Sequence, residues 1–378
     1  MKYLFLFFLF YYDILSLDGI GEKMSKNSTY DYKCPSCNAI LKFDPHGQNW
    51  KCEYCKHEYN LEELKKYNEK QGRKELKDEH KVKLEKDFNG MDIYTCNNCG
   101  AQIVADENTS ATFCVYCKNT AILKNKLVDE FNPDYVIPFK FTKEDAIEKF
   151  KKIHKPLMPK IFNNPKNIEE TKGIYIPFWL YDINTNGSID ADCKRITSWS
   201  SGEYHYTKTD VYLAKRSGEF NYTRVPVDGS KHFADDVMNS IEPFNYDDLK
   251  EFNHSYLSGF LAEKYDVLSD EALEIAFKRA ETSTVNTLKN DIKGYNVVSV
   301  RSNNINKDKV KDEYVLLPVW LLNVKYKDKL YTFAMNGQTG KLIGDIPVDP
   351  VKAIIWWIIV FGIGIIIFVI LYLVGVIG

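Results

Sequence analysis

The 378-residue sequence predicts an α+β protein, in which two small cysteine-rich β modules precede a larger mixed domain and a single C-terminal transmembrane helix. Three observations carry this prediction. Eight of the nine cysteines fall into two copies of one spacing, patterns typical of helices and of strands alternate between residues 125 and 348, and residues 353–378 contain no charged side chain. The 50 basic and 52 acidic side chains nearly cancel, so net charge provides no general attraction for nucleic acid.

The N-terminal extension, residues 1–23, carries conflicting signals. Its aromatic-rich run 3–12 resembles the core of a signal peptide, but no small-residue cleavage site follows it. The extension is therefore either a short second membrane segment or is not translated in the cell. In the second case we expect synthesis to start at Met24, because the codons of residues 21–23 can form a bacterial ribosome-binding site before the ATG.

Residues 30–60 and 91–124 each predict a β module with one tetrathiolate metal site, because each holds four cysteines in the pattern C-x2-C-x14-C-x2-C. Strand, turn and strand follow one another over 39–51 and again over 102–113. Such a hairpin brings two cysteine pairs around one ion, as in a zinc ribbon, and we expect two structural zinc ions per chain. The predicted ligands are Cys34, Cys37, Cys52, Cys55, Cys96, Cys99, Cys114 and Cys117.

Other chemistry fits these cysteines less well. Disulfides would need an oxidising compartment and do not require a repeated spacing, and a redox C-x-x-C motif lacks its βαβ surroundings here. Iron also suits four thiolates, but nothing else in the sequence suggests electron transfer. The cysteine turns need a left-handed backbone, for which Gly100 and Asn38 are suitable and Lys56 and Lys118 are less so. We expect His57 to be a solvated surface residue.

Residues 61–90 predict a charged linker between the modules. Lys and Glu interleave along it with few apolar positions, as in a solvated helix or a mobile spacer. Inside the modules the lysines are matched or outnumbered by acidic residues, so the clustered positive charge needed for phosphate binding is missing from their sequences.

Residues 125–348 predict one α+β domain or two related lobes. One helix begins at a near capping box, 142–145, and stops before Pro156, and a longer helix begins near Ser269 and ends at Gly294. Four β patterns occupy 174–183, 204–214, 297–301 and 314–326, and a final hairpin turns at 336–340.

A short internal echo suggests the two lobes. Ile176-Pro177-Phe178-Trp179-Leu180 resembles Leu317-Pro318-Val319-Trp320-Leu321, and each string follows a predicted helix. We interpret Trp179 and Trp320 as core aromatic residues rather than as ligand-stacking groups.

Motifs for catalysis are missing from the sequence. It contains no phosphate-binding loop, no G-x-S-x-G elbow and no H-E-x-x-H motif, so a nucleotide-driven motor is not supported. The polar clusters 228–232 and Asp235-Asp236 have the composition of surface turns. Cys193, the cysteine outside the modules, is expected to be a small buried hydrophobe. We therefore predict no enzyme activity.

Residues 350–378 predict a transmembrane helix. About 20 apolar residues cross the hydrocarbon core of a bilayer, and Asp349-Pro350 provides a defined helix start. Only Lys352 gives a local topology signal. Because thiolate zinc sites belong in a reducing compartment, we expect a single-pass, tail-anchored protein of the cell membrane with the bulk of its chain in the cytoplasm.

Four strings accompany these features: Cys114-Val115-Tyr116-Cys117, Ile176-Pro177-Phe178-Trp179-Leu180, Val225-Pro226-Val227-Asp228-Gly229 and Phe333-Ala334-Met335-Asn336-Gly337-Gln338-Thr339-Gly340-Lys341. With them, the chain from about Tyr30 onwards resembles a family of bacterial zinc-ribbon membrane proteins. Members are commonly labelled TFIIB-type zinc ribbon-containing proteins, and some carry the name of the primosomal replication-restart helicase. The resemblance implies zinc binding by the eight cysteines, whereas the missing nucleotide loop disagrees with the helicase label.

The sequence thus predicts a membrane-anchored adaptor that binds a protein partner. The alternative is a nucleic-acid-binding protein at the membrane, related to replication or transcription, with Trp50, Tyr54 and Tyr116 as base-stacking groups. A third alternative, an enzyme, would depend on Asp228 or His232. The near-neutral modules favour a protein partner over nucleic acid.

Overall fold

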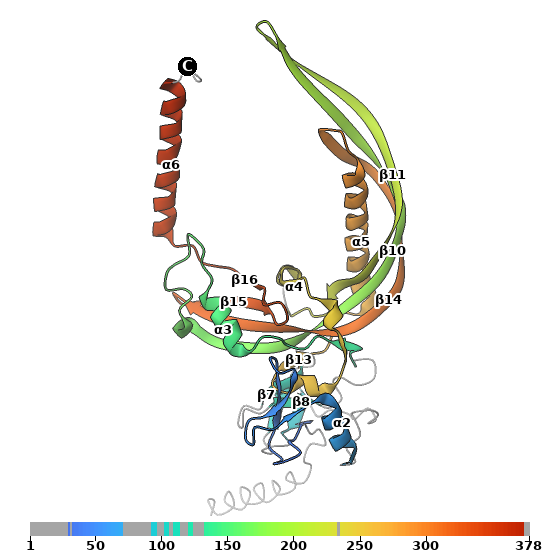
Figure 1. The fold of residues 1–378 in the computed structure, drawn as a ribbon, viewed down its shortest axis with the longest axis vertical. Helices are drawn as coiled ribbons and strands as arrows, with labels where there is room; N and C mark the ends of the chain where they lie inside the picture. The colour runs from blue at the N-terminus through green and yellow to red at the C-terminus, as the bar shows by residue number, and fades with distance from the viewer. Residues whose placement is uncertain are drawn as a thin grey trace, which may run out of the picture. The chain divides into compact units, whose positions relative to one another are not determined.

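The chain divides into two compact units (Figure 1). The computed structural model describes residues 29–30, 32–70, 92–96, 102–105, 109–113, 120–123, 132–232 and 235–373. Unit 1 comprises Met1–Val136, Tyr175–Lys231 and Leu249–Leu317, and unit 2 comprises Ile137–Ile174, His232–Asp248 and Pro318–Gly378. Each unit is therefore assembled from three separate stretches of the chain.

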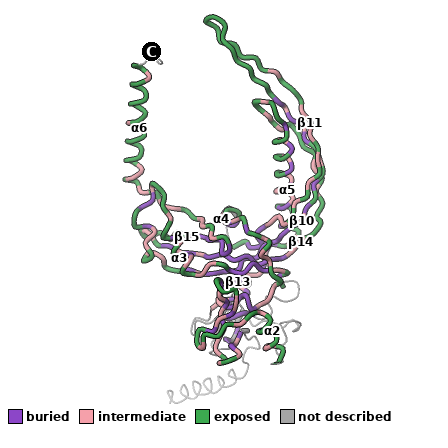
Figure 2. The backbone as a smooth tube through the Cα atoms, viewed as in Figure 1, coloured by how far each residue is buried: buried purple, intermediate pink, exposed green. Residues whose placement is uncertain are grey.

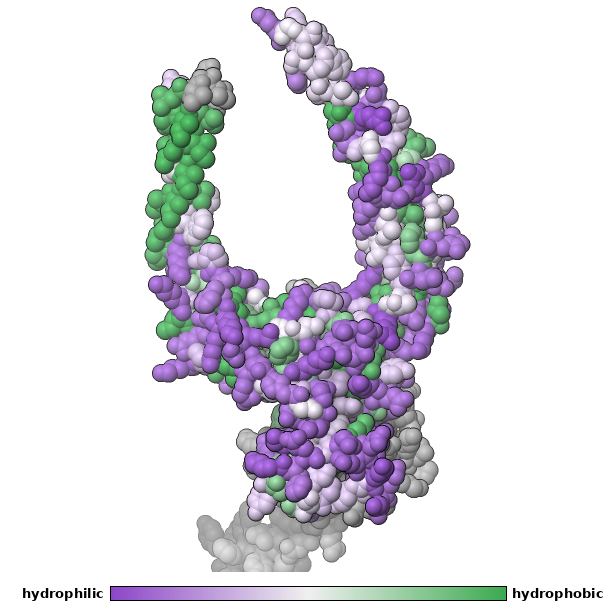
Figure 3. Space-filling model, viewed as in Figure 1, coloured by the Kyte–Doolittle hydropathy of each residue, from purple (hydrophilic) through white to green (hydrophobic). Residues whose placement is uncertain are grey.

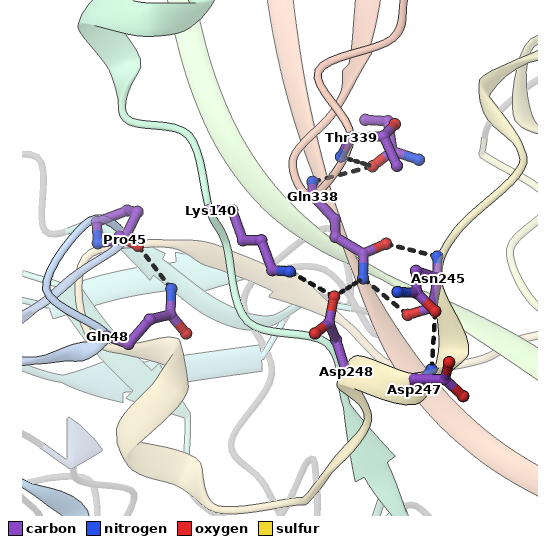
Figure 4. A network of polar contacts seen from close by, with 9 residues as sticks. Pro45, Gln48, Lys140, Asn245, Asp247, Asp248, Gln338 and Thr339 are labelled. Atoms are coloured by element: carbon purple, nitrogen blue, oxygen red, sulfur yellow. Dashed lines mark hydrogen bonds and ion pairs between the residues drawn. The ribbon is translucent and has the colours of Figure 1, made fainter.

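The first cysteine module is a three-stranded antiparallel sheet in unit 1. Strands β2 (Leu41–Asp44), β3 (Asn49–Cys52) and β4 (Glu58–Tyr59) lie in that order. The β2–β3 turn is closed by a hydrogen bond from the Gln48 side chain to the Pro45 carbonyl (Figure 4). The predicted strand, turn and strand are confirmed here.

Helix α2 (Leu61–Lys70) opens the predicted charged linker. Asn60 and Glu63 cap it reciprocally, because each side chain accepts a hydrogen bond from the backbone amide of the other at 2.9 Å. Leu64 is its buried residue. Residues 71–91 lie outside the described residues.

The second cysteine module places its strands in two sheets. The strands are β5 (Asp92–Thr95), β6 (Gln102–Ala105), β7 (Thr109–Phe113) and β8 (Thr120–Leu123). β6 pairs with β5 and β7 pairs with β8, so the predicted β6–β7 ladder is absent from the strands that the structure describes. Apolar residues of β5, β6 and β8, among them Tyr94, Ala105 and Leu123, share one buried cluster, and this burial joins the strands instead. The β7–β8 pair is extended by β1 (Thr29–Tyr30) and β13 (Leu261–Glu263).

Three long strands run through the mixed domain, namely β10 (Ile168–Ser201), β11 (Tyr204–Asp228) and β14 (Val297–Tyr326). The four short β patterns of the sequence are segments of these strands, so their predicted lengths were wrong. β10 and β11 pair continuously in antiparallel register from Ser201 and Tyr204 back to Ile183 and Tyr222, where the register shifts. Towards the turn both strands are exposed (Figure 2). The pattern 174–183 of β10 ends before this part, whereas the pattern 204–214 of β11 lies in it and ends before the strand does.

Helix α5 (Ser269–Asp291) covers part of the β10–β11 hairpin within unit 1. Leu288 and the following Ile292 pack in a buried cluster with apolar residues of β10, among them Cys193. The predictions of this helix and of a buried Cys193 are therefore confirmed.

Unit 2 has a separate aromatic core. Phe150 of α3 (Lys143–Lys151), Phe162 and Phe333 of β15 (Lys329–Asn336) have ring centroids 5.1 to 6.0 Å apart. The capping box that the sequence predicts at Thr142 is present.

The other short elements of the chain are β9 (Tyr135–Val136), η2 (Pro165–Asn167), α4 (Asp235–Ile241), η3 (Tyr246–Asp248), β12 (Lys250–Glu251), η4 (His254–Leu257) and β16 (Leu342–Gly344).

A polar network holds the turn at 336–340 in unit 2 (Figure 4). The Gln338 carboxamide accepts a hydrogen bond from the Asn245 amide at 2.8 Å and donates to the Asn245 carbonyl at 2.7 Å. It also donates to the Asp248 carboxylate, which accepts a second hydrogen bond from the Lys140 ammonium. The Gln338 carboxamide thus has partners on both of its polar atoms inside the unit, as expected of a structural contact.

The internal echo of the sequence is a structural repeat. The carbonyls of Pro177 in β10 and Pro318 in β14 each accept a hydrogen bond from the glycine that directly follows the neighbouring strand, Gly229 at 2.9 Å and Gly337 at 2.8 Å. In each copy the side chain before the glycine accepts a hydrogen bond from the amide of the residue after it, at 3.0 and 2.9 Å. One strand–turn motif is therefore present in both units.

The helices of the two repeats lie in different units. Helix α3 precedes β10 and packs in unit 2, whereas α5 precedes β14 and packs in unit 1, in one cluster with apolar residues of β10 and of β14. Trp179 and Trp320, the tryptophans of the echo, are buried and donate to backbone carbonyls at 2.9 Å, as expected of core residues.

Helix α6 (Pro350–Leu373) is long and apolar enough to cross a membrane, with a mean hydropathy of 3.1 and no part of it buried. Its surface is apolar along its length (Figure 3). The Asp349 side chain accepts a hydrogen bond from the Val351 amide and caps the helix, as predicted.

Candidate metal centre

Two cysteine turns of equivalent backbone geometry face each other in the first module. The amide of Asn38 donates to the Cys34 carbonyl, and the amide of Lys56 donates to the Cys52 carbonyl, both at 2.9 Å. Asn38 and Lys56 have φ angles of 61° and 63°, the left-handed conformation that such a turn needs. Lys56 thus adopts this conformation although its side chain is less suited to it, so the turn geometry outweighs the local preference.

The four sulfur atoms of these turns form one cluster. All lie within 4.8 Å of one another, and the Cys34–Cys55 and Cys37–Cys52 sulfur pairs are each 3.5 Å apart. Zn–S bonds of about 2.3 Å at tetrahedral angles place sulfurs about 3.8 Å apart, so the cluster fits a tetrathiolate zinc site. The thiols are free, and His57 is exposed, as predicted, and is no member of the cluster.

Tyr59 on β4 closes one side of the cluster. Its hydroxyl lies 3.4 Å from Cys34 Sγ and 2.6 Å from Ser36 Oγ. Burial raises the pKa of the Cys34 thiol, but hydrogen bonds from Tyr59 and from the amides of Cys37 and Ser36 outweigh it and lower this pKa from 9.0 to about 6. The role of Tyr59 was not predicted from the sequence, although its place in the strand that follows the second cysteine turn was a signal.

The charges on the surface of this module are paired. Lys42 lies 3.0 Å from Glu53, and Lys51 lies 3.0 Å from Glu58. The predicted balance of positive and negative charge in this module thus includes two ion pairs, Lys42 with Glu53 and Lys51 with Glu58.

The aromatic face of the module is attached to another part of unit 1. The indole of Trp50 donates a hydrogen bond of 2.8 Å to the Ser255 carbonyl, and its ring and that of Phe43 pack on Tyr256. Trp50 is only 1% exposed, so its prediction as a base-stacking group was wrong. Tyr54, in contrast, is 82% exposed, and Tyr116 lies outside the described residues.

Of the four cysteines predicted to form the second metal site, Cys96 is among the described residues. Cys96 follows β5 and is buried in the cluster with Tyr94 and Leu123. Cys99, Cys114 and Cys117 lie outside the described residues, so the second zinc ion stays a prediction.

The polar cluster after β11 forms a turn. The Asp228 side chain accepts a hydrogen bond from the Ser230 amide at 3.0 Å, and the Ser230 hydroxyl donates to Glu263 at 3.1 Å. The Lys231 amide donates to the Asp266 carboxylate at 2.8 Å. Lys231 and His232 are exposed, but Asp228 and Ser230 are buried, so the prediction of a surface turn was wrong for these two residues.

Comparison with known proteins gives one relationship. Over 328 residues the chain is 34% identical to "Uncharacterized protein YdjG" of Bacillus subtilis (strain 168), an alignment that covers 86% of this chain and 92% of the relative. No family model matches the sequence. No solved structure matches it either.

Proposed function

The chain belongs to the family of the Bacillus subtilis protein YdjG, and from this premise and the cysteine cluster we propose that it is a membrane-anchored, zinc-bearing adaptor that binds a protein partner on the cytoplasmic side. The observation that carries the proposal is the attachment of the first module. Its aromatic face is buried on Ser255 and Tyr256, which leaves the cysteine turns and Tyr54 on the surface.

A structural role for the metal is supported by the ligand set. Cys34, Cys37, Cys52 and Cys55 would hold one zinc ion with four thiolates, which leaves no coordination position for a substrate or a water molecule. The ion would link the two cysteine turns and so support the module. Four free thiolates also require a reducing compartment, which favours the cytoplasm.

The exposed surface of the module suits a protein partner better than nucleic acid. Its lysines at 42 and 51 are paired with carboxylates, and Trp50 is not accessible to a base. Phosphate binding needs unpaired positive charge, whereas protein interfaces are centred on aromatic residues such as Tyr54. The same surface therefore disfavours the nucleic-acid alternative at this module.

Photo-crosslinking in intact cells tests the proposal. We expect a crosslinkable amino acid in place of Tyr54 of the full-length chain to capture one reproducible protein adduct. The matched control replaces Glu274, an exposed residue of α5, and should not capture the same protein. A nuclease-sensitive adduct at position 54 would favour the nucleic-acid alternative, and equal adducts at both positions would contradict the adaptor surface.

A further inference from the structure

The loop that follows α3 reaches the start of α6 within unit 2 (Figure 1). We call residues 151–162, from the last residue of α3 to Phe162, the juxtahelical loop. The amide of Asp349 donates a hydrogen bond of 2.8 Å to the Leu157 carbonyl, and the ammonium of Lys352 donates one of 2.7 Å to the Met158 carbonyl. These two contacts attach the loop to the first turn of a helix that begins about 190 residues later in the sequence.

The juxtahelical loop is an ordered structure. The Met158 amide donates to the Lys155 carbonyl at 3.0 Å, and the Phe162 amide donates to the Pro159 carbonyl at 3.1 Å, so two tight turns follow each other. The Phe162 ring is buried in the aromatic core of unit 2. The surface that the loop presents is therefore fixed.

That surface is basic. Lys151, Lys155 and Lys160 are exposed, and none has an ion-pair partner among the residues that the structure describes. Lys155 is three residues and Lys160 two residues from Met158, so their Cα atoms lie within about 11 Å of the Met158 Cα. Both lysines are therefore close to the first turn of α6. The side chain of Ile161, between the last lysine and the buried Phe162, is 59% exposed.

The neighbouring acidic groups do not neutralise this charge. Glu148 pairs with Lys152 at 2.6 Å, and the Asp349 side chain caps α6. Asp345 is exposed, but one carboxylate does not balance three lysines. A net positive surface with one aliphatic side chain is thus part of the loop that is bonded to the start of the apolar helix. Figure 3 shows hydrophilic residues where this helix begins.

We propose that the juxtahelical loop lies on the anionic lipid headgroups of the leaflet at which α6 enters the bilayer. The proposal rests on α6 crossing a membrane and is independent of the zinc site. Charge complementarity selects anionic phospholipids, since each lysine near a negative surface contributes to binding, and Ile161 can enter the interfacial layer. The sequence near the helix offers only Lys352, whereas the fold brings Lys155 and Lys160 to the same end and so supports a cytoplasmic start of the helix.

Spin-label measurements on the reconstituted full-length chain test this site. The protein is placed in phosphatidylcholine vesicles with trace spin-labelled phosphatidylglycerol or spin-labelled phosphatidylcholine, and the immobilised fraction of each probe is measured. We expect the chain to prefer the anionic probe by about threefold at low salt, and the preference to decrease in 0.5 M salt. In K151Q/K155Q/K160Q the ratio should fall to about one.

Two matched variants make the result specific. K151R/K155R/K160R keeps the charge and should keep the preference. K194Q/K278Q/K293Q removes the same charge from exposed lysines of unit 1 and should also keep it. A wild-type ratio of one, an unchanged ratio in the K151Q/K155Q/K160Q variant, or an equal loss in the unit 1 variant would overturn the proposal.

Discussion

Among single residues, Trp50 attaches the first cysteine module to the rest of unit 1. Its indole N–H is used by the Ser255 carbonyl, and its ring contacts Phe43 and Tyr256 at centroid distances of 5.2 Å. An aromatic residue in a metal-binding hairpin has the same sequence signature whether it is buried or exposed. Ser255 and Tyr256 are about 200 positions away from Trp50 in the sequence, so the role of Trp50 could not be predicted from local sequence. The metal site of the four cysteines could be predicted, because their spacing is local.

Substitution of Trp50 should detach the module in two steps. Trp50→Phe keeps most of the packing and loses one hydrogen bond, so the amides of residues 41–52 should exchange about fivefold faster, which corresponds to about 1 kcal/mol. Trp50→Ala also removes the ring, at a cost of about 3–5 kcal/mol, and should abolish most of the protection. Hydrogen exchange of the full-length chain in detergent measures both. Tyr54→Ala is the matched control, and an effect as large as that of Trp50→Ala would contradict this role of Trp50.

At the scale of elements, the start of α5 depends on neighbouring strands. The N-cap residue Leu268 has no side-chain capping bond. The Ser269 hydroxyl instead donates to the Asp312 carboxylate of β14 at 2.6 Å, and the Tyr181 hydroxyl of β10 donates to the Ser269 carbonyl at 2.7 Å. The start of the helix near Ser269 was predicted, because its signals are local. The contacts that attach this start to β14 and β10 could not be predicted, because they join residues far apart in the sequence.

Asp312→Asn should loosen the first turns of α5. Loss of a hydrogen bond to a charged group costs about 1.5 kcal/mol, so exchange of residues 269–280 should become about tenfold faster. Exposed Asp308, four residues earlier in β14, provides the control Asp308→Asn, which should have no such effect. Hydrogen exchange at pH 7 compares the two variants. Equal protection of residues 269–280 in both would contradict a stabilising role of the Ser269–Asp312 hydrogen bond.

The same contact predicts a pH dependence. Burial raises the pKa of Asp312, but the hydrogen bonds from Ser269 and Lys309 outweigh it and lower the pKa below its ordinary 3.8. Because the folded-state pKa is lowered, this stabilisation is present above pH 3.8 and is lost as the pH falls through the lower folded value. Exchange corrected for its intrinsic rate should therefore lose protection in this window for the wild type and not for Asp312→Asn.

The limits of prediction also appear at this scale. The capping box of α3 and the turn at 336–340 were predicted, because their signals are local. The lengths of β10, β11 and β14 were not, because an exposed strand is specified by its partner rather than by an alternating pattern. The β6–β7 pairing failed for a related reason, since the buried cluster around Tyr94 selects other partners.

At the scale of the whole molecule, each unit needs distant parts of the chain. Helices α3 and α5 pack in different units, and each unit combines three separate stretches of the chain. The sequence echo indicated two lobes, but it did not predict that α5 packs on β10 as well as on β14, because both helices precede their strands in the same order. The first cysteine set belongs to the sheet of β2, β3 and β4, whereas Cys96 of the second set follows β5 of another sheet.

Elemental analysis of the intact protein counts the metal sites. We expect two zinc ions per chain in reducing buffer, and one after Cys34→Ser with Cys52→Ser or after Cys99→Ser with Cys117→Ser. Cys193→Ser should leave two, because Cys193 lies in the apolar cluster under α5. A wild-type count of one that Cys99→Ser with Cys117→Ser does not change would eliminate the second site, and a count of zero would eliminate both.

The β10–β11 hairpin has a consequence for the order of synthesis. Its strands end at Asp228, whereas the helix that covers them ends at Asp291, so about 60 residues must still be made. At about 5–20 residues per second, the apolar face around Cys193 waits uncovered for about 3–12 s on each nascent chain. The interval is set by the linear order of the gene rather than by the stability of the finished fold. It makes this hairpin a point at which newly made chains can associate or be bound by a chaperone.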